Sequence, residues 1–188
     1  FSLRAFPRLP FYPAQAPDSF FPDNPSLDGW VRWDAAHYIN LALHGYGDGN
    51  PSPGLGWGFF PLYSLLMRGL TEALFLPITE RNLALAGLGI SNLCFITLVV
   101  LLARWSARLF GDEAARSTIL LLCLSPFAFF FNVAYTESLF MLLVVATLML
   151  ATSNKWLAAG LVAGLATATR LVGLALIPAL LYLAYKRR

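Results

Sequence analysis

Five uncharged, apolar runs in the second half of the chain constrain its fold more than any other feature. They cover residues 83–103, 117–136, 138–154, 156–169 and 171–185 and are separated by charged residues or short charged turns. A helix needs about 20 apolar residues to cross the ~30 Å hydrocarbon layer of a bilayer. The chain is 58% hydrophobic and 12% charged, whereas soluble domains are about a quarter charged. This pattern predicts an all-α polytopic membrane protein and excludes a cytosolic globule, a disordered tail and a disulfide scaffold.

Composition divides the chain near residue 61. Residues 1–61 contain 9 of the 12 prolines and no run long enough to span a bilayer. They are rich in aromatic residues, which suit the headgroup layer, so we expect an ordered outer loop with interfacial helices. Residues 62–82 are expected to form an interfacial helix and a connection. Residues 83–188 are expected to form transmembrane helices at about 83–104, 114–131, 137–153, 156–169 and 171–185.

The last two apolar runs contain only 14 and 15 residues, which is short for a span. They predict either a hairpin of two short helices or one long tilted helix with Arg170 in its middle. The turn after the first span is placed in the cytoplasm because it carries Arg104, Arg108 and Arg116. A hairpin brings Lys155 and the basic residues 186–188 to that same side, whereas one long helix leaves the terminal cluster outside. We therefore favour the hairpin.

This topology has a consequence for three charged residues that are far apart in the chain. The loop 1–61 lies outside, and the turns that carry Glu137 and Arg170 emerge on the same side. Asp34, Glu137 and Arg170 are thus expected at one membrane face.

A cluster of polar residues around Asp34 is the first candidate for chemistry. If residues 35–44 are helical, Asp34, His37 and Tyr38 share one face. The carboxylate could act as a general base, with the imidazole or phenol holding an acceptor hydroxyl. The alternative is that Asp34 is a helix N-cap and His37 an interfacial packing residue. Spacing leaves both interpretations open.

Glu137 and Arg170 interrupt apolar runs, where ionisable residues are costly and often functional. The guanidinium fork of Arg170 suits a phosphate, so we expect it to bind an anionic lipid headgroup. The alternatives are a salt bridge to Glu137 or Asp34, or snorkelling to the outer headgroups. For Glu137 the alternative is a place in the first turn of a helix, where the dipole favours an acid.

Other features indicate structure or exclude partners. Gly160 and Gly164 form a small-xxx-small pair, which suits close helix packing. No basic stripe suggests nucleic acid, and no residue set predicts a zinc site. Asp34 and Asp48 could still join a hard-metal site, so a divalent cation is a possible cofactor.

Several motifs, taken in order, resemble the PIG-V (GPI mannosyltransferase II) family and its bacterial relatives. The similarity runs from about residue 30 to 183. The motifs are Trp33-Asp34-Ala-Ala-His37-Tyr38, Phe59-Phe60-Pro61-Leu62-Tyr63, Tyr135-Thr136-Glu137-Ser138 and Thr169-Arg170-Leu-Val-Gly173.

This resemblance implies an inverting GT-C glycosyltransferase with its active site on the outer or luminal face. The implied donor is a polyprenyl- or dolichyl-phosphate sugar, with mannose expected, and the acceptor is a lipid or a glycan. By motif, Asp34 is the expected base and Arg170 lies near the lipid phosphate. The residues expected to contact substrate with Arg170 are Glu137, His37, Tyr38 and Tyr135.

The resemblance also implies an integral protein of the bacterial cytoplasmic membrane or the endoplasmic reticulum membrane, in contact with membrane lipids. We expect the chain to be incomplete, because the family's first span and its later spans are not recognised in it. A non-catalytic lipid-binding or transport subunit on the same scaffold is the alternative.

Overall fold

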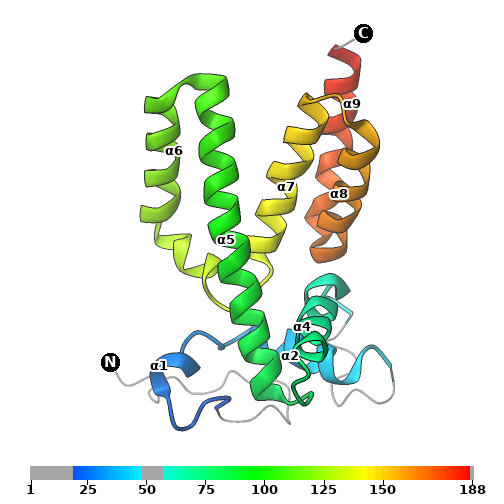
Figure 1. Ribbon diagram of the computed structural model, residues 1–188. Coiled ribbons are helices and arrows are strands. Elements are labelled where there is room, and N and C mark those ends of the chain that lie inside the picture. Colours follow the sequence, from blue (N-terminus) through cyan, green and yellow to red (C-terminus); the bar gives the residue numbers. More distant parts are fainter. Residues whose placement is uncertain (1–18, 48–56, 187–188) are drawn as a thin grey trace. The chain divides into compact units, whose positions relative to one another are not determined.

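A computed structural model describes residues 19–47 and 57–186 of the chain (Figure 1). Every regular element within these residues is a helix, so the predicted all-α class is confirmed for them. The elements are α1 (Pro25–Asp28), α2 (Ala35–His44), α4 (Pro61–Ala73), α5 (Glu80–Phe110), α6 (Asp112–Leu124), η2 (Pro126–Phe131), α7 (Glu137–Thr152), α8 (Trp156–Thr169), η3 (Leu171–Ala175) and α9 (Leu176–Lys186).

The helices form two compact units. The first unit contains the described residues up to Ile90 together with Val133–Tyr135, and the second contains Ser91–Asn132 and the described residues from Thr136 onwards. The long helix α5 begins in the first unit and ends in the second.

In the first unit, α2 packs against α4. Pro61 starts α4, where a missing N–H costs nothing and the fixed φ suits a helix. The inward face of α4 includes Tyr63 and Met67, both with no exposed surface. The Tyr63 hydroxyl donates to the carbonyl of Gly87 at 2.9 Å. This bond ties α4 to the start of α5.

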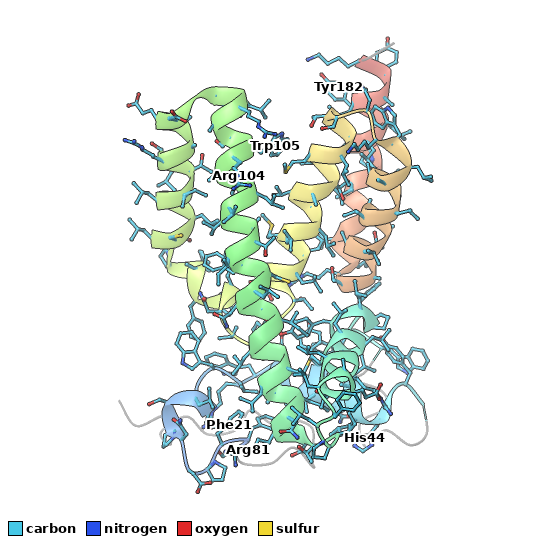
Figure 2. The ribbon with its side chains drawn as sticks, viewed as in Figure 1. Phe21, His44, Arg81, Arg104, Trp105 and Tyr182 are labelled. Carbon is cyan, nitrogen blue, oxygen red and sulfur yellow. The ribbon has the colours of Figure 1, made fainter. Side chains whose placement is uncertain are left out.

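Helix α5 is long and apolar enough to cross a bilayer, and it is the one helix of that kind among the described residues. Figure 2 shows Arg81 and Arg104 on this helix. At 1.5 Å per residue they are separated by about 35 Å along its axis. That separation exceeds the ~30 Å hydrocarbon layer, so both charges can lie outside it.

The expected span at about 114–131 is broken in the structure. Helix α6 ends at Leu124, and Pro126 begins the 3₁₀ helix η2. Ser125 is extended (φ −59°, ψ 137°), as the residue before a proline usually is. Its hydroxyl accepts from the amide of Phe127 at 3.3 Å. In Figure 1, α5 and α6 run antiparallel as a hairpin.

Residues 156–186 form a hairpin and not one long helix. Helix α8 ends at Thr169, and the next residue, Arg170, is extended (φ −152°, ψ 138°). After η3 the helix α9 runs back in the opposite direction and contacts α7 (Figure 1). A Cβ on Gly173 would lie 2.5 Å from the Thr167 backbone nitrogen, so only glycine fits this turn. The closely packed core between these helices and α7 includes Ala163, Ala166 and Leu176.

The predicted close packing at Gly160 and Gly164 is wrong within the described part of the chain. A Cβ added to either glycine would meet nothing within 4 Å, and both residues are exposed. Helix α8 instead packs through its buried alanines.

Candidate functional site

Asp34 stands at the N-terminal end of α2, before Ala35. It occupies the N-cap position, yet its side chain makes no capping hydrogen bond, and the residue is exposed. The structure therefore does not show the alternative in which the Asp34 carboxylate caps the helix. The carboxylate is open to solvent, as a general base must be to reach a substrate hydroxyl.

Tyr135 holds the turn that carries Asp34. The amide of Asp34 donates to the Tyr135 hydroxyl at 3.2 Å, and this hydroxyl donates to the carbonyl of Arg32 at 3.1 Å. Between them, Trp33 has a φ of 52°, a left-handed conformation that non-glycine residues rarely adopt. One phenol thus bridges both sides of a strained residue.

The segment before this turn is anchored by Asp28, which is 2% exposed. Its carboxylate accepts from the amides of Phe20 at 2.8 Å and Phe21 at 3.1 Å, and it forms an ion pair with Arg32. The guanidinium of Arg81 lies 5.5 Å from the ring centre of Phe21, and Figure 2 labels both residues. These contacts fix the backbone that leads into Asp34.

His37 and Tyr38 follow Asp34 on α2 but have different surroundings. The His37 ring stacks on Phe59 with a centroid distance of 4.5 Å and is half-buried. Burial lowers the pKa of His37, and the nearby Asp34 charge opposes that shift. Tyr38 is buried and contacts Phe59 and Tyr63 edge-on, at 5.1 and 5.2 Å. The structure therefore brings Asp34 and His37 together and places Tyr38 in the core.

The second candidate cluster is an ion pair between Arg170 and Glu137. The Nη1 atom of Arg170 lies 2.5 Å from Glu137 Oε1 and donates to Thr136 Oγ1 at 3.2 Å. Glu137 is the first residue of α7. The alternative of a salt bridge for Arg170 and that of a first-turn position for Glu137 are thus both observed.

The pair is not sealed from solvent. The Arg170 and Glu137 side chains are 39% and 29% exposed. The interactions of this guanidinium with described residues all use Nη1, so its Nη2 and Nε edge faces no protein acceptor within that part of the chain. That edge has the fork geometry that suits a phosphate.

A pocket of about 210 Å³ lies between α2 and α4 in the first unit. Its polar lining comes from Tyr46, Ser64 and Arg68, and Asp34 does not line it. The described residues contain no group of three His, Cys, Asp or Glu placed to bind a metal ion. Asp48, named with Asp34 for a hard-metal site, lies outside the described residues.

Sequence reasoning missed the residues that support these side chains. The spacing of Asp28 and Arg32, four residues apart, is a usable signal for an ion pair. Thr136 adjoins Glu137 but gave no signal of its own. Tyr135 was expected to contact substrate, and nothing in the sequence indicated its bonds to a turn 101 residues earlier.

Comparison with known proteins adds a family match over most of the chain. The model of a family described as Mannosyltransferase (PIG-V) matches residues 15–187. A protein named GPI alpha-1,6-mannosyltransferase 2 from Cricetulus griseus is 32% identical over 163 residues, covering 83% of this chain and 32% of that protein. The protein of that name from Mus musculus is 31% identical over 154 residues, covering 79% and 30%.

A GPI mannosyltransferase 2 from Drosophila pseudoobscura pseudoobscura is 28% identical over 120 residues, covering 61% of this chain and 25% of that protein. The chain therefore spans about a third or less of the length of these curated relatives. No solved structure matches the chain.

Proposed function

The chain belongs to the PIG-V mannosyltransferase family, and from this membership we propose that it is part of a GT-C-type integral membrane glycosyltransferase. The proposed reaction moves a sugar, mannose in the first instance, from a polyprenyl- or dolichyl-phosphate donor to a lipid-linked or glycan acceptor. The names of the rodent relatives support mannose as the sugar and a GPI intermediate as one acceptor to test. The site faces the outer or luminal side of a bacterial cytoplasmic or endoplasmic reticulum membrane.

The observation that carries this proposal is the exposed, uncapped carboxylate of Asp34 on a turn held from behind by Tyr135. In the proposed step, Asp34 takes the proton from an acceptor hydroxyl, and the hydroxyl oxygen attacks the anomeric carbon of the donor. The bond from that carbon to the phosphate oxygen breaks, and the lipid phosphate leaves with the electron pair. A single displacement of this kind inverts the anomeric carbon.

Arg170 is proposed to bind the phosphate that leaves. Glu137 and Thr136 engage Nη1, which orients the guanidinium, while Nη2 and Nε are available to two phosphate oxygens. The Arg170 guanidinium is then already in position to stabilise the negative charge that develops on the phosphate. His37 is proposed to lie at the acceptor side of Asp34, because the two residues share the first turn of α2.

The motifs that carry Asp34 and Arg170 both lie within the part of the chain that matches the family, which supports assigning the two residues to one reaction. The proposed topology also places both at the outer face, with α5 as one span, α6 and η2 as the return span, and α7, α8 and α9 as further proposed spans.

Turnover of Asp34→Asn tests the proposal. In full-length protein supplied with a polyprenyl-phosphate mannose donor, loss of the base should lower kcat by about 10²–10⁴-fold. Asp23→Asn is the matched control, because it removes an exposed carboxylate from the same loop, and it should keep the parental rate. Product is measured by mass spectrometry of the acceptor.

Wild-type turnover in Asp34→Asn would show that Asp34 is not the base. Bound polyprenyl phosphate that depends on Arg170, with no transfer product from any sugar donor, would favour the non-catalytic lipid-binding or transport subunit. The ion pair of Arg170 with Glu137 is compatible with that alternative, because it needs no reaction.

A further inference from the structure

The segment Val133–Tyr135 is joined to the turn before α2 at several points. The amide of Ala134 donates to the carbonyl of Trp30 at 3.1 Å, and the Tyr135 hydroxyl bonds to the backbone of Arg32 and Asp34. Val133, Ala134 and Tyr135 are 2%, 0% and 5% exposed. The segment is thus buried and supports the turn, whose residues Trp33 and Asp34 are exposed.

The Tyr135 hydroxyl donates to the carbonyl of Arg32 and accepts from the amide of Asp34, so it bonds to the backbone on both sides of Trp33. Trp33 itself is half-exposed and has a φ of 52°. A left-handed tryptophan is unfavourable and persists only where its surroundings impose it. The two hydrogen bonds of Tyr135 lie on both sides of this residue, and the amide of Ala35 also donates to the carbonyl of Arg32 across it at 3.2 Å.

We propose that Tyr135 is a positioning residue for the base: its hydroxyl holds Trp33 left-handed and so sets where the Asp34 carboxylate stands. This inference rests on the proposed function of Asp34. It assigns Tyr135 a role through Asp34 in place of the substrate contact expected from the sequence. Its hydroxyl is directed at backbone, and its side chain is buried.

The first test is the steady-state kinetics of Tyr135→Phe in full-length protein. The ring remains and only the hydroxyl is lost, so we expect kcat to fall by about 10–100-fold, as for a small misplacement of a catalytic group. The KM values for donor and acceptor should stay within about twofold, because no substrate contact is removed. Tyr182→Phe, which deletes an exposed hydroxyl on α9, is the control and should match wild type. An unchanged kcat, or a loss confined to KM, would overturn the inference.

Combination with Asp34→Asn separates an indirect role from a direct one. If Tyr135 acts through Asp34, Tyr135→Phe should cause no further loss of the residual turnover of Asp34→Asn. Equal fold losses in the two backgrounds would show that Tyr135 acts independently of Asp34 and would overturn the proposal.

A structural readout keeps this inference distinct from the proposed function. With 5-fluorotryptophan incorporated, the ¹⁹F resonance of Trp33 should shift or broaden in Tyr135→Phe, while those of Trp105 and Trp156 stay in place. An unmoved Trp33 resonance would overturn the positioning role even if activity fell. Wild-type turnover in Asp34→Asn would instead show that Asp34 is not the base, independently of the Trp33 resonance.

A second variant covers the case in which Tyr135→Phe lowers the folded yield. Trp33→Gly relieves the strain, because glycine adopts positive φ freely. Trp33→Gly combined with Tyr135→Phe should then recover folded protein. Failure to recover would show that Tyr135 supports the fold by a route other than the turn.

Discussion

At the scale of single residues, His37 shows how packing alters a charge state next to the proposed base. Its ring lies flat on Phe59, and its half-buried position lowers its pKa below the ordinary value of 6.5 despite the nearby Asp34. The neutral imidazole is therefore the form present at neutral pH. A neutral ring beside Asp34 can accept a hydrogen bond from the hydroxyl of the acceptor substrate or donate one to it.

This shift predicts a pH dependence of stability. The unfolded chain gains a proton at His37 below about pH 6.5, whereas the folded chain resists it until a lower pH. The contribution of His37 is thus present above pH 6.5 and lost as the pH falls through the folded pKa. The unfolding midpoint should drop between about pH 7.5 and about pH 5.5, and His37→Gln should reduce that drop.

Thermal unfolding at both pH values measures this effect. His44→Gln is the matched control because His44 is exposed at the other end of α2, and it should leave the drop unchanged. The same drop in His37→Gln as in wild type would contradict the prediction.

At the scale of elements, the reversal between α8 and α9 depends on a close approach of backbone to backbone. Gly173 is buried against Ala166 and Thr167, at the end of the helix that Arg170 terminates. The extended conformation of Arg170 and the missing Cβ of Gly173 together allow the chain to turn. This turn presents the Arg170 side chain to Glu137 and Thr136.

Gly173→Ala should therefore destabilise the protein. The added Cβ would meet backbone at 2.5 Å, and overpacking of this kind costs about 1–3 kcal/mol. Gly164→Ala is the control, because a Cβ there meets nothing within 4 Å, and replacing a helical glycine by alanine is neutral or gains up to about 1 kcal/mol. Unfolding midpoints in detergent would measure both effects. A midpoint of Gly173→Ala equal to that of wild type would show that the turn has room for a methyl group.

At the scale of the whole molecule, the central prediction is that Asp34 and Arg170 face the same side of the membrane. We expect residues 1–61, Glu137 and Arg170 outside, and the basic turns at 104–116 and Lys155 inside. The structure describes each compact unit, and the topology that joins them to a bilayer is a prediction from charge.

Accessibility labelling of single cysteines tests this topology after Cys94 and Cys123 are replaced by serine. In sealed vesicles of known orientation, a membrane-impermeant maleimide on the outer or luminal side should label Asp23→Cys and Leu171→Cys. It should label Arg116→Cys and Lys155→Cys only after permeabilisation. All four replaced residues are exposed, so burial does not limit the reaction. Labelling of Asp23→Cys and Leu171→Cys from opposite sides would rule out a shared site.

Sequence alone determined the helical class, the family and the identity of the charged candidates. Apolar periodicity and run length depend only on local composition, and proline and glycine mark helix ends through their own backbone preferences. Thus α2 begins after Asp34 and α8 ends just before Arg170, where the sequence placed a candidate helix start and a charge between runs.

The surroundings of those charged residues follow from the three-dimensional packing of the chain. It paired Arg170 with Glu137, left the Asp34 carboxylate uncapped and set the Tyr135 hydroxyl across a left-handed Trp33. The physical reason is that each of these contacts joins residues through packing over long sequence separation, up to 103 residues for Tyr135 and Arg32. Local preference carries no information about such partners, and a left-handed tryptophan contradicts it outright.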